Sequence, residues 1–315
     1  MCATVLMTDR AWPDDLVERE VIERAGHTLV CGPADPAPEA EIDALVRTHR
    51  PDAILTCWAR VSDAAISGAD NLRIVARMGV GLDNIAVDAA TRSGVRVTNV
   101  PDYCVPEVSD SAVGFVLAWT RGIVHFDRDV RQGNWNPGSA KLRRLADLTC
   151  GIVGYGRIGR LTAAKLRAFG CTVVAHGRSF KGEAGVEAVF LNELLSRSDV
   201  VILHTPLTPE THHLIGKDQL ALMKPGSFLV NVSRGAVVDQ DAALDALNSG
   251  HLGGVGFDVL ETEPEVPSAL REHPAAIITP HVAFSSDASL IEMRRRAAEE
   301  VVRVLAGQAP ENPCN

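Results

Sequence analysis

The sequence predicts an α/β protein built from two parallel-sheet units. Short apolar runs alternate with longer helical patterns along the chain, which is typical of parallel strands joined by helices. The length of 315 residues exceeds what a single compact core usually holds. The alternation is interrupted at Asn99–Pro106, where Pro101 and Pro106 break the chain. We therefore expect one α/β series before this break and a second one after it.

The first hundred residues predict a small sheet covered on both faces. Nearly all residues of its strands are apolar, which indicates burial on both sides. The strands are expected at Ala3–Met7, Thr28–Val30, Ala53–Thr56, Ile74–Arg77 and Arg96–Thr98, with helices at Asp14–Ala25, Glu39–Thr48 and Asp83–Ser93.

After the break, the sequence predicts a long apolar helix from Val108 to Thr120, followed by a more polar helix over Arg121–Gln132. A loop at Gly133–Ser139 comes next. A helix this apolar either packs inside one domain or forms a subunit interface, and the pattern favours neither.

The second series begins near Leu148 and predicts six strands, the number found in a dinucleotide-binding sheet. They are expected at Thr149–Val153, Cys171–Ala175, Val200–Leu203, Phe228–Asn231, Gly253–Asp258 and Ile277–Thr279. An amphipathic helix over Ser289–Ala306 follows. Its basic cluster Arg294–Arg296 stands among glutamates, and we interpret it as a solvated helix face.

Composition excludes several classes of function. A net charge of −9 argues against nucleic-acid binding, which needs clustered Lys and Arg. No apolar run is long enough to span a bilayer, and the N-terminus carries no signal-peptide pattern. The seven cysteines show no metal-site spacing, so we expect no metal and a reducing compartment, the cytoplasm.

A Gly-x-Gly-x-x-Gly pattern leaves the predicted strand Thr149–Val153 and opens a helix through Leu166. Gly154 permits the tight turn, Gly156 lets a pyrophosphate approach the backbone, and Gly159 allows close packing of helix on strand. The alternative is that the glycines serve only a packed turn. In this strand–turn–helix context we favour dinucleotide binding.

The end of the next strand indicates which dinucleotide is preferred. In NAD sites, a carboxylate there binds the adenosine ribose. Here Arg178 and Ser179 occupy this turn, and the first acidic residue is Glu183. Both Arg178 and Ser179 can donate to a 2′-phosphate, although Arg178 could equally be a solvent-facing side chain. We therefore predict that NADP(H) is favoured over NAD(H).

Arg234, Glu263 and His281 follow the fourth, fifth and sixth predicted strands of the second series. In a parallel sheet the carboxyl ends of the strands line one crevice beside the cofactor. An Arg can clamp a substrate carboxylate, a His can transfer a proton to a carbonyl oxygen, and a Glu can keep that His protonated. Each residue alone has an ordinary structural interpretation, but together they indicate oxidation or reduction of 2-oxo and 2-hydroxy acids.

With these motifs, the chain resembles the D-isomer-specific 2-hydroxyacid dehydrogenases, the family of phosphoglycerate dehydrogenase and glyoxylate/hydroxypyruvate reductase. The matching landmarks, in chain order, are Gly79–Ile85, Asn99–Pro101, the glycine loop, His204–Thr208, Met223–Gly226, Asn231–Gly235, Asp258–Pro264 and Pro280–His281.

The resemblance implies two doubly wound parallel-sheet domains, with a Rossmann NAD(P)-binding domain inserted into a flavodoxin-like substrate-binding domain. It places the substrate-binding domain at residues 1–98 and 286–315 and the dinucleotide-binding domain at 99–285. It also implies a homodimer formed through helices at about residues 102–145.

The resemblance further implies a role for each matching residue. Arg234, Glu263 and His281 correspond to the family's catalytic residues. Cofactor contacts are implied for Arg157 and Ile158 on the pyrophosphate, Thr205 near the adenosine, and Val232, Arg234 and Asp258 near the nicotinamide, with Asp258 holding the carboxamide.

For the substrate, the resemblance implies that the backbone amides of Val80 and Gly81 bind the carboxylate. Arg60 and Arg77 could reach a second anionic group such as a phosphate, or could make surface or interdomain pairs. Ser109-Asp110-Ser111 departs from the usual Ala-Glu-His, which leaves the role of this stretch open.

Two other functions compete with a small 2-oxo acid reductase. One is a non-catalytic, dinucleotide-sensing corepressor resembling the C-terminal-binding proteins, whose extended disordered tail is missing here. The other is oxidation of formate or phosphite. Formate dehydrogenases of the family pair the His with Gln, so Glu263 argues against formate and leaves phosphite open.

Overall fold

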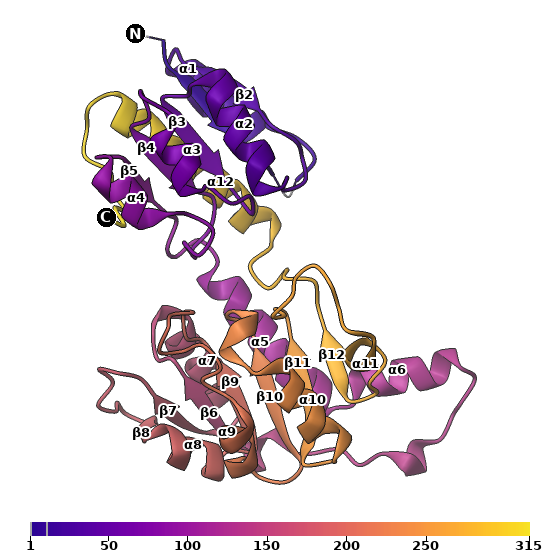
Figure 1. The fold of residues 1–315 in the computed structure, drawn as a ribbon. Helices are drawn as coiled ribbons and strands as arrows, with labels where there is room; N and C mark the ends of the chain where they lie inside the picture. The colour runs from indigo at the N-terminus through magenta and orange to yellow at the C-terminus, as the bar shows by residue number, and fades with distance from the viewer. Residues whose placement is uncertain (1, 11) are drawn as a thin grey trace. The chain divides into compact units, whose positions relative to one another are not determined.

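The computed structural model describes residues 2–10 and 12–315. The chain divides into two compact units. Unit 1 consists of the residues up to Tyr103 together with Ser286–Asn315, and unit 2 is the continuous stretch Cys104–Ser285. Each unit is a parallel sheet with helices on both faces (Figure 1), as the sequence predicts.

Unit 1 contains a five-stranded parallel sheet in the order β2-β1-β3-β4-β5. This is the flavodoxin-like doubly wound order, in which the chain reverses direction across the sheet after its first strands. Both central strands, β3 and β4, are buried at every position, because helices cover both faces. The strands are β1 (Thr4–Met7), β2 (Thr28–Cys31), β3 (Ala53–Thr56), β4 (Ile74–Arg77) and β5 (Arg96–Thr98).

Helices α1 (Leu16–Arg24) and α12 (Asp287–Leu305) pack side by side, and α12 also packs on β3 and β4. Helices α2 (Glu39–His49), α3 (Asp63–Ser67) and α4 (Val87–Arg92) pack against one another in series. The last part of the chain therefore completes a layer of the sheet that the first hundred residues begin.

Two of these helices differ from the prediction. Helix α3, which we did not predict, has only five residues, too few for a helical period, and is capped by the Ser62 side chain, which accepts a hydrogen bond from the backbone N–H of Ala65. Helix α4 begins at Val87 rather than Asp83 because the preceding residues form a turn, in which the backbone N–H of Ile85 donates to the carbonyl of Leu82.

The interpretation of Arg294–Arg296 as a solvated face is wrong for Arg294. Its side chain is 8% exposed and pairs at 2.8 Å with Glu18, whose side chain is fully buried. It also pairs with Asp14 and lies 5.1 Å from the centre of the Trp12 ring. Pattern alone could not separate a paired, buried arginine from a solvated one, because its acidic partners, Glu18 on α1 and Asp14 just before that helix, lie far away in the sequence.

Unit 2 contains a seven-stranded parallel sheet in the order β12-β11-β10-β9-β6-β7-β8. From β8 to β11 this is the Rossmann order, with the switch point between β6 and β9. The strands are β6 (Thr149–Val153), β7 (Thr172–His176), β8 (Glu187–Ala188), β9 (Val200–Leu203), β10 (Ser227–Asn231), β11 (Leu252–Phe257) and β12 (Ala276–Ile278). The prediction missed β8, which has only two residues.

Helices cover both faces of this larger sheet. Helices α5 (Val105–Thr120) and α7 (Arg157–Ala168) pack against each other, while α8 (Leu191–Arg197), α9 (Lys217–Leu222) and α10 (Gln240–Asn248) pack in series; α11 (Ser268–Arg271) lies beside β12. Helix α5 contacts β10 and β11 and buries Val108, Ala112 and Val116. Helix α5 therefore packs inside one domain, which is the first of the two interpretations of the long apolar helix.

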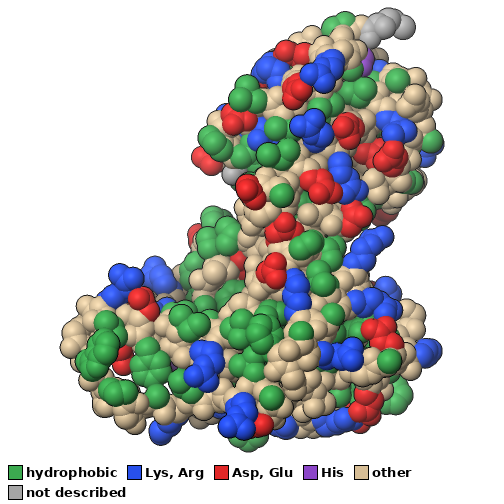
Figure 2. All heavy atoms as spheres, turned by 180° about the vertical axis from the view of Figure 1, so that it is seen from behind, with side chains coloured by type: hydrophobic (Ala, Val, Ile, Leu, Met, Phe, Trp, Pro, Cys, Tyr) green, Lys and Arg blue, Asp and Glu red, His purple; other side chains and the backbone are tan. Residues whose placement is uncertain are grey.

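Helix α6 (Ile123–Arg131) is different, because it is amphipathic and buries none of its residues. Ile123 is 57% exposed and Val130 50% exposed, and Trp135 in the following loop is 83% exposed. Figure 2 shows hydrophobic side chains gathered at the end of unit 2 that carries α6.

Within residues 2–10 and 12–315, no helix combines the length and the apolar character needed to cross a lipid bilayer.

Candidate functional site

Most of the predicted site residues lie beyond the carboxyl ends of the parallel strands of unit 2. The glycine loop follows β6, and Arg178 and Ser179 follow β7. Thr205, Arg234, Glu263 and His281 follow β9, β10, β11 and β12 in the same order as these strands lie in the sheet. Parallel strands bring all of these residues to one edge, which is where doubly wound sheets bind ligands.

The glycine loop has the geometry that a dinucleotide needs. Gly154 has φ +97°, and a Cβ there would lie 2.6 Å from the backbone of His204. A Cβ on Gly159 would lie 2.2 Å from the carbonyl oxygen of Gly154, so helix α7 can approach β6 only without a side chain. A Cβ on Gly156 would meet nothing within 4 Å. The loop thus leaves open space at the position where a pyrophosphate would meet the free N–H groups of α7.

Arg157 and Ile158 form the first turn of helix α7, at the start of which these free N–H groups lie. Arg157 is exposed and Ile158 is half-buried. Thr205 is held by its hydroxyl, which donates to the carbonyl of Val153 at 3.2 Å. Arg157 and Ile158 therefore directly follow the open space at Gly156, whereas Thr205 lies on the loop that packs against Gly154.

The turn after β7 exposes Arg178 and Ser179. Glu183, the nearest acidic residue along the chain, is occupied elsewhere: it accepts a hydrogen bond from the Tyr155 hydroxyl at 2.6 Å and pairs with Arg160. The hydrogen bond from Tyr155 and the charge of Arg160 hold the pKa of Glu183 below its usual value. Burial and this contact raise the pKa of Tyr155 to about 12. The basic and hydroxyl groups of this turn are thus exposed, while its carboxylate is engaged.

Arg234 stands on a turn that is shaped by Asn231. The Asn231 side chain, almost fully buried, donates to the carbonyl of Arg234 at 2.8 Å and accepts from both the backbone N–H and the hydroxyl of Ser233. The Arg234 side chain in turn donates to the carbonyl of Ser233 at 2.8 Å. Val232, in the same turn, is buried. Asn231 was predicted only as part of the landmark Asn231–Gly235, without a role of its own, although a polar residue that ends an apolar strand was the available signal.

Asp258 organises the segment that carries His281. Its carboxylate is 2% exposed and accepts hydrogen bonds from the Thr279 hydroxyl and from the backbone N–H groups of Val282 and Ala283. The backbone N–H of His281 donates to the carbonyl of Asp258 at 2.8 Å, and His281 has the left-handed φ of +52°. Asp258 therefore fixes the backbone on both sides of a residue in an unfavourable conformation.

Glu263 and His281 are brought together directly. Nδ1 of His281 donates to Oε2 of Glu263 at 2.8 Å, and the backbone N–H of Leu260 donates to the other carboxylate oxygen at 2.9 Å. Burial opposes ionisation of Glu263, but the hydrogen bond and charge of His281, with help from Leu260 and Arg234, lower its pKa below the usual value. Three predicted site residues from three separate strands therefore interact electrostatically.

In unit 1, the predicted substrate loop follows β4. Val80 is 39% exposed and Gly81 is half-buried. Arg77 is only 6% exposed; it donates to the carbonyl of Met78, and its guanidinium lies 5.7 Å from the centre of the Trp58 ring. Its Nε has no hydrogen-bond partner among the described residues. Arg60, in contrast, is exposed and pairs with Glu39 at 2.8 Å.

Sequence reasoning also missed Asp9, which shapes the neighbouring loop of unit 1. Asp9 is buried and accepts hydrogen bonds from the backbone N–H groups of Cys57, Trp58 and Ala59. Its signal in the sequence is an acidic residue placed two positions after an apolar strand.

Comparison with known proteins agrees with this geometry. The family model described as "D-isomer specific 2-hydroxyacid dehydrogenase, NAD binding domain" matches residues 113–283. A glyoxylate reductase of Korarchaeum cryptofilum is 38% identical over 291 residues, covering 89% of this chain and 88% of the relative. A D-3-phosphoglycerate dehydrogenase of Mycobacterium tuberculosis is 40% identical over 262 residues, 82% of this chain, but the chain spans only about half (50%) of that protein's length.

Solved structures extend the likeness to both units. The TT0316 protein of Thermus thermophilus has a TM-score of 0.92 at 35% identity, with 99% of this chain and 100% of the other covered. A D-lactate dehydrogenase of Aquifex aeolicus, solved with NAD and lactic acid, has a TM-score of 0.85 at 29% identity, with 96% of each chain covered. The chain therefore belongs to the D-isomer specific 2-hydroxyacid dehydrogenase family.

Proposed function

We propose that this protein is a dehydrogenase that transfers a hydride between a nicotinamide dinucleotide and a small 2-oxo or D-2-hydroxy acid. The observation that carries the proposal is the hydrogen bond of 2.8 Å between His281 and Glu263 at the sheet edge that also holds the glycine loop. The names of the relatives, glyoxylate reductase and D-3-phosphoglycerate dehydrogenase, support the same reaction class.

The residues present fit a dinucleotide. The open space beside Gly156 and the first turn of α7, with Arg157 and Ile158, would hold the pyrophosphate. Thr205 would lie toward the adenosine, and Val232 and Asp258 toward the nicotinamide. When bound, this cofactor supplies or accepts the hydride; the remaining chemistry belongs to the protein.

The protein's part is to orient the acid and move one proton. Arg234 would hold the substrate carboxylate and polarise its neighbouring carbonyl, since a guanidinium offers paired N–H donors. Because Nδ1 of His281 faces Glu263, Nε2 is the nitrogen that would give its proton to the carbonyl oxygen during reduction and take it back during oxidation. Glu263 fixes the orientation of the ring and places a negative charge beside Nδ1.

This reaction is tested with a panel of 2-oxo acids, including glyoxylate, hydroxypyruvate and a phosphono-analogue, with NADPH and with NADH. Turnover of at least one of them is expected to fall about 10²–10⁴-fold in His281→Asn, the loss typical of a general acid. Dinucleotide binding without any turnover would instead favour the corepressor-like alternative. Turnover of phosphite, without turnover of any 2-oxo acid, would instead favour phosphite oxidation.

We further propose that NADP(H) is preferred over NAD(H). The support is the exposed Arg178 and Ser179 in the turn after β7, combined with the engagement of Glu183 by Tyr155 and Arg160. Replacing Arg178 by Asp removes a donor to the 2′-phosphate and adds a repelling charge. We expect the ratio of kcat/KM for NADPH to that for NADH to fall at least about tenfold, since a charged hydrogen bond contributes about 1.5–3 kcal/mol. An unchanged ratio would refute the preference.

For the substrate, we propose that the backbone amides of Val80 and Gly81 bind the carboxylate and that Arg77 faces a second anionic group. A buried guanidinium with an unsatisfied Nε supports this assignment for Arg77, because such a charge is costly unless an anion compensates it. Arg60 has less support, since it already pairs with Glu39.

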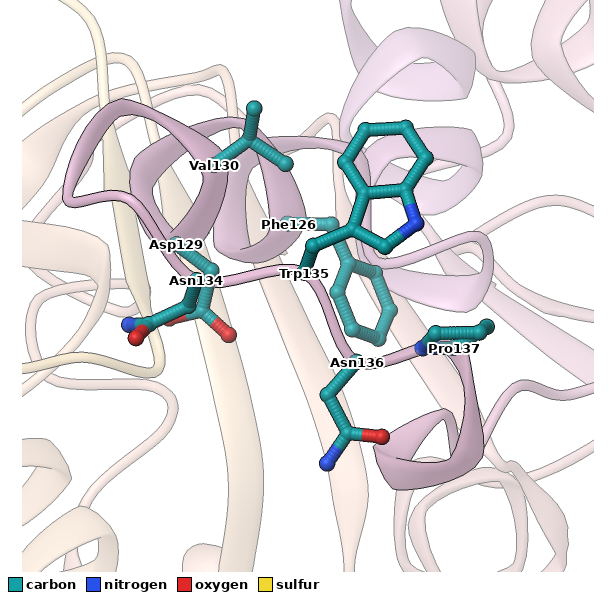
Figure 3. A pocket seen from close by; sticks show the side chains of 7 residues that line it. All are labelled: Phe126, Asp129, Val130, Asn134, Trp135, Asn136 and Pro137. Carbon is teal, nitrogen blue, oxygen red and sulfur yellow. The ribbon is translucent and has the colours of Figure 1, made fainter.

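We also propose a homodimer in the cytoplasm. Helix α6 and its loop carry the exposed Ile123, Val130 and Trp135, and Figure 3 shows the rings of Trp135, Phe126 and Pro137 around a hollow of this segment. The family resemblance supports a second copy of the chain as the partner. All seven cysteines are free thiols, which suits a reducing compartment.

Sedimentation tests the dimer. The native chain should sediment with twice the mass of one chain, and Ile123→Asp combined with Val130→Asp should give single chains. A native chain that sediments as a monomer at micromolar concentration would contradict the proposal.

A further inference from the structure

Two adjacent imidazoles and a carboxylate lie together on unit 2. His212 and His213 belong to the segment between β9 and α9, and Glu261 belongs to the loop after β11, 48 residues beyond His213. The two imidazole rings stack with their centres 4.1 Å apart, and Nε2 of His213 lies 2.7 Å from Oε1 of Glu261. One ligand atom from each of the three side chains lies within 4.8 Å of the other two. All three are at least partly exposed, so an ion in solution can reach them.

The backbone holds this cluster between three loops. His213 has the left-handed φ of +49° and donates from its backbone N–H to the carbonyl of Ala236 at 2.8 Å. The neighbouring Gly235 packs so closely on the Glu261 loop that a Cβ there would lie 1.9 Å from the carbonyl oxygen of Leu260. The three side chains are therefore placed by backbone contacts that do not depend on any ligand.

We propose that His212, His213 and Glu261 form a binding site for one divalent transition-metal ion, with Zn²⁺ as the ion that suits the donors best. Two imidazoles and one carboxylate are a ligand set that zinc accepts, and a water molecule can complete its tetrahedron. Mg²⁺ and Ca²⁺ prefer ligand sets made entirely of oxygen, so the two nitrogens select against them. Small rotations of exposed side chains bring the ligand atoms to zinc distances of about 2.0–2.2 Å.

In the described part of the chain, a second histidine–carboxylate pair on the surface lacks the third ligand of this cluster. His125 and Asp129 on α6 also approach each other, at 3.7 Å, but they are not joined by a third ligand among the described residues. This pair provides a matched control, because it has the same chemistry with one ligand fewer.

The site also links two loops of the proposed active site, and this part rests on the proposed function. Arg234 precedes Gly235, and Glu263, which holds His281, follows Glu261 by two residues. An ion held by Glu261 would restrain the loop that orients His281. We therefore expect bound Zn²⁺ to change the turnover of the enzyme.

Metal binding is tested on tag-free protein by titration calorimetry with Zn²⁺ and by absorption spectroscopy with Co²⁺. The native chain should bind one ion in a site without the charge-transfer bands of thiolate ligands. His212→Gln should weaken binding at least about tenfold, since even outer partners of metal ligands contribute about 10–100-fold. His125→Gln should leave the affinity unchanged. Equal affinity in the native and His212→Gln chains, or thiolate bands, would overturn the site.

Turnover tests the link to catalysis. Without metal, the His212→Gln enzyme should match the native one, because the ring that stacks on His212 among the described residues belongs to His213, which lies outside the proposed catalytic residues. A circular dichroism spectrum checks that the variant is folded. Added Zn²⁺ should alter turnover only in the native enzyme, and an identical response in both would overturn the link. Because the binding measurements contain neither substrate nor cofactor, their failure is distinguishable from failure of the proposed hydride transfer.

Discussion

Both carboxylate oxygens of Glu263 accept hydrogen bonds from the protein, one from His281 and one from the backbone N–H of Leu260. This arrangement orients the imidazole more tightly than a single exposed contact could, because the carboxylate is itself fixed. Its effect on the reaction should therefore depend on charge as well as on position.

Glu263→Gln is the variant that separates these two effects. The amide keeps the size of the side chain but removes the negative charge beside Nδ1 of His281. We expect kcat to fall by at least about tenfold, and by less than the loss in His281→Asn. Steady-state kinetics with the best 2-oxo acid checks this. Glu265→Gln, an exposed glutamate in the same loop, is the control and should retain native turnover.

His204 gives a prediction about acid stability. Both of its ring nitrogens are buried and make no hydrogen bond to a described residue, and burial lowers its pKa from 6.5 to about 3. Between these values the unfolded chain binds a proton that the folded chain does not. The stability is thus fully present above pH 6.5 and is lost progressively as the pH falls toward 3.

The expected slope from this single group is up to about 1.4 kcal/mol of unfolding free energy per pH unit. Urea unfolding at pH 7 and at pH 5 measures it. His204→Leu should show a smaller difference between the two pH values than the native chain, whereas His49→Leu, at an exposed position, should not. A native-like difference in His204→Leu would show that other groups cause the acid sensitivity.

At the scale of single elements, the turn from β6 into α7 contains two glycines with separable roles. Gly159→Ala would place a methyl group 2.2 Å from a backbone oxygen and should destabilise the fold by about 1–3 kcal/mol or more. Gly156→Ala meets open space at an ordinary φ of −88° and should leave stability unchanged. It should nevertheless weaken dinucleotide binding, because the methyl group occupies the approach of the pyrophosphate.

Thermal unfolding and NADPH fluorescence titration of both variants check this pair. A Gly156→Ala protein that binds NADPH like the native chain would mean that the pyrophosphate does not meet the backbone at this residue.

Most strands could be predicted from sequence because parallel strands are buried on both faces and appear as uninterrupted apolar runs. Ala53–Thr56, Ile74–Arg77 and Val200–Leu203 have the bounds that the apolar runs indicated. Helix α3 and strand β8 could not be found in this way, since five and two residues are too short for a period to appear.

The candidate site was predictable in a similar, limited sense. Arg234, Glu263 and His281 stood out because each is a chemically active side chain after an apolar strand. The pairing of Arg294 with Glu18 and the cluster of His213 with Glu261 were not predictable, because their partners meet only through the fold. Burial also could not be foreseen for Arg77, which resembles any arginine at the end of a strand.

At the scale of the whole molecule, the pair Arg294–Glu18 joins α12 to α1 and so connects the last helix of the chain to the first. Arg294→Met would leave Glu18 buried without its partner, which should lower the unfolding free energy of unit 1 by about 3–5 kcal/mol. Adding Glu18→Leu should restore much of the loss, since the uncompensated charge is then gone.

Urea unfolding of the single and double variants checks this prediction. Arg295→Ala changes an exposed neighbour on the same helix and should alter stability by less than about 0.5 kcal/mol. A single Arg294→Met variant as stable as the native chain would show that the buried pair contributes nothing to unit 1.

The placement of α12 on β3 and β4 has a consequence for biosynthesis. The nascent chain emerges from the ribosome with its N-terminal side first, and domains generally fold as units while they emerge. Unit 2 is complete once residue 285 has emerged, whereas the sheet of unit 1, although made first, must wait for its covering helix. The nascent polypeptide therefore carries an apolar surface through the whole synthesis of the inserted unit. We expect chaperone dependence and aggregation during refolding to originate in the strands of unit 1 that precede the inserted unit.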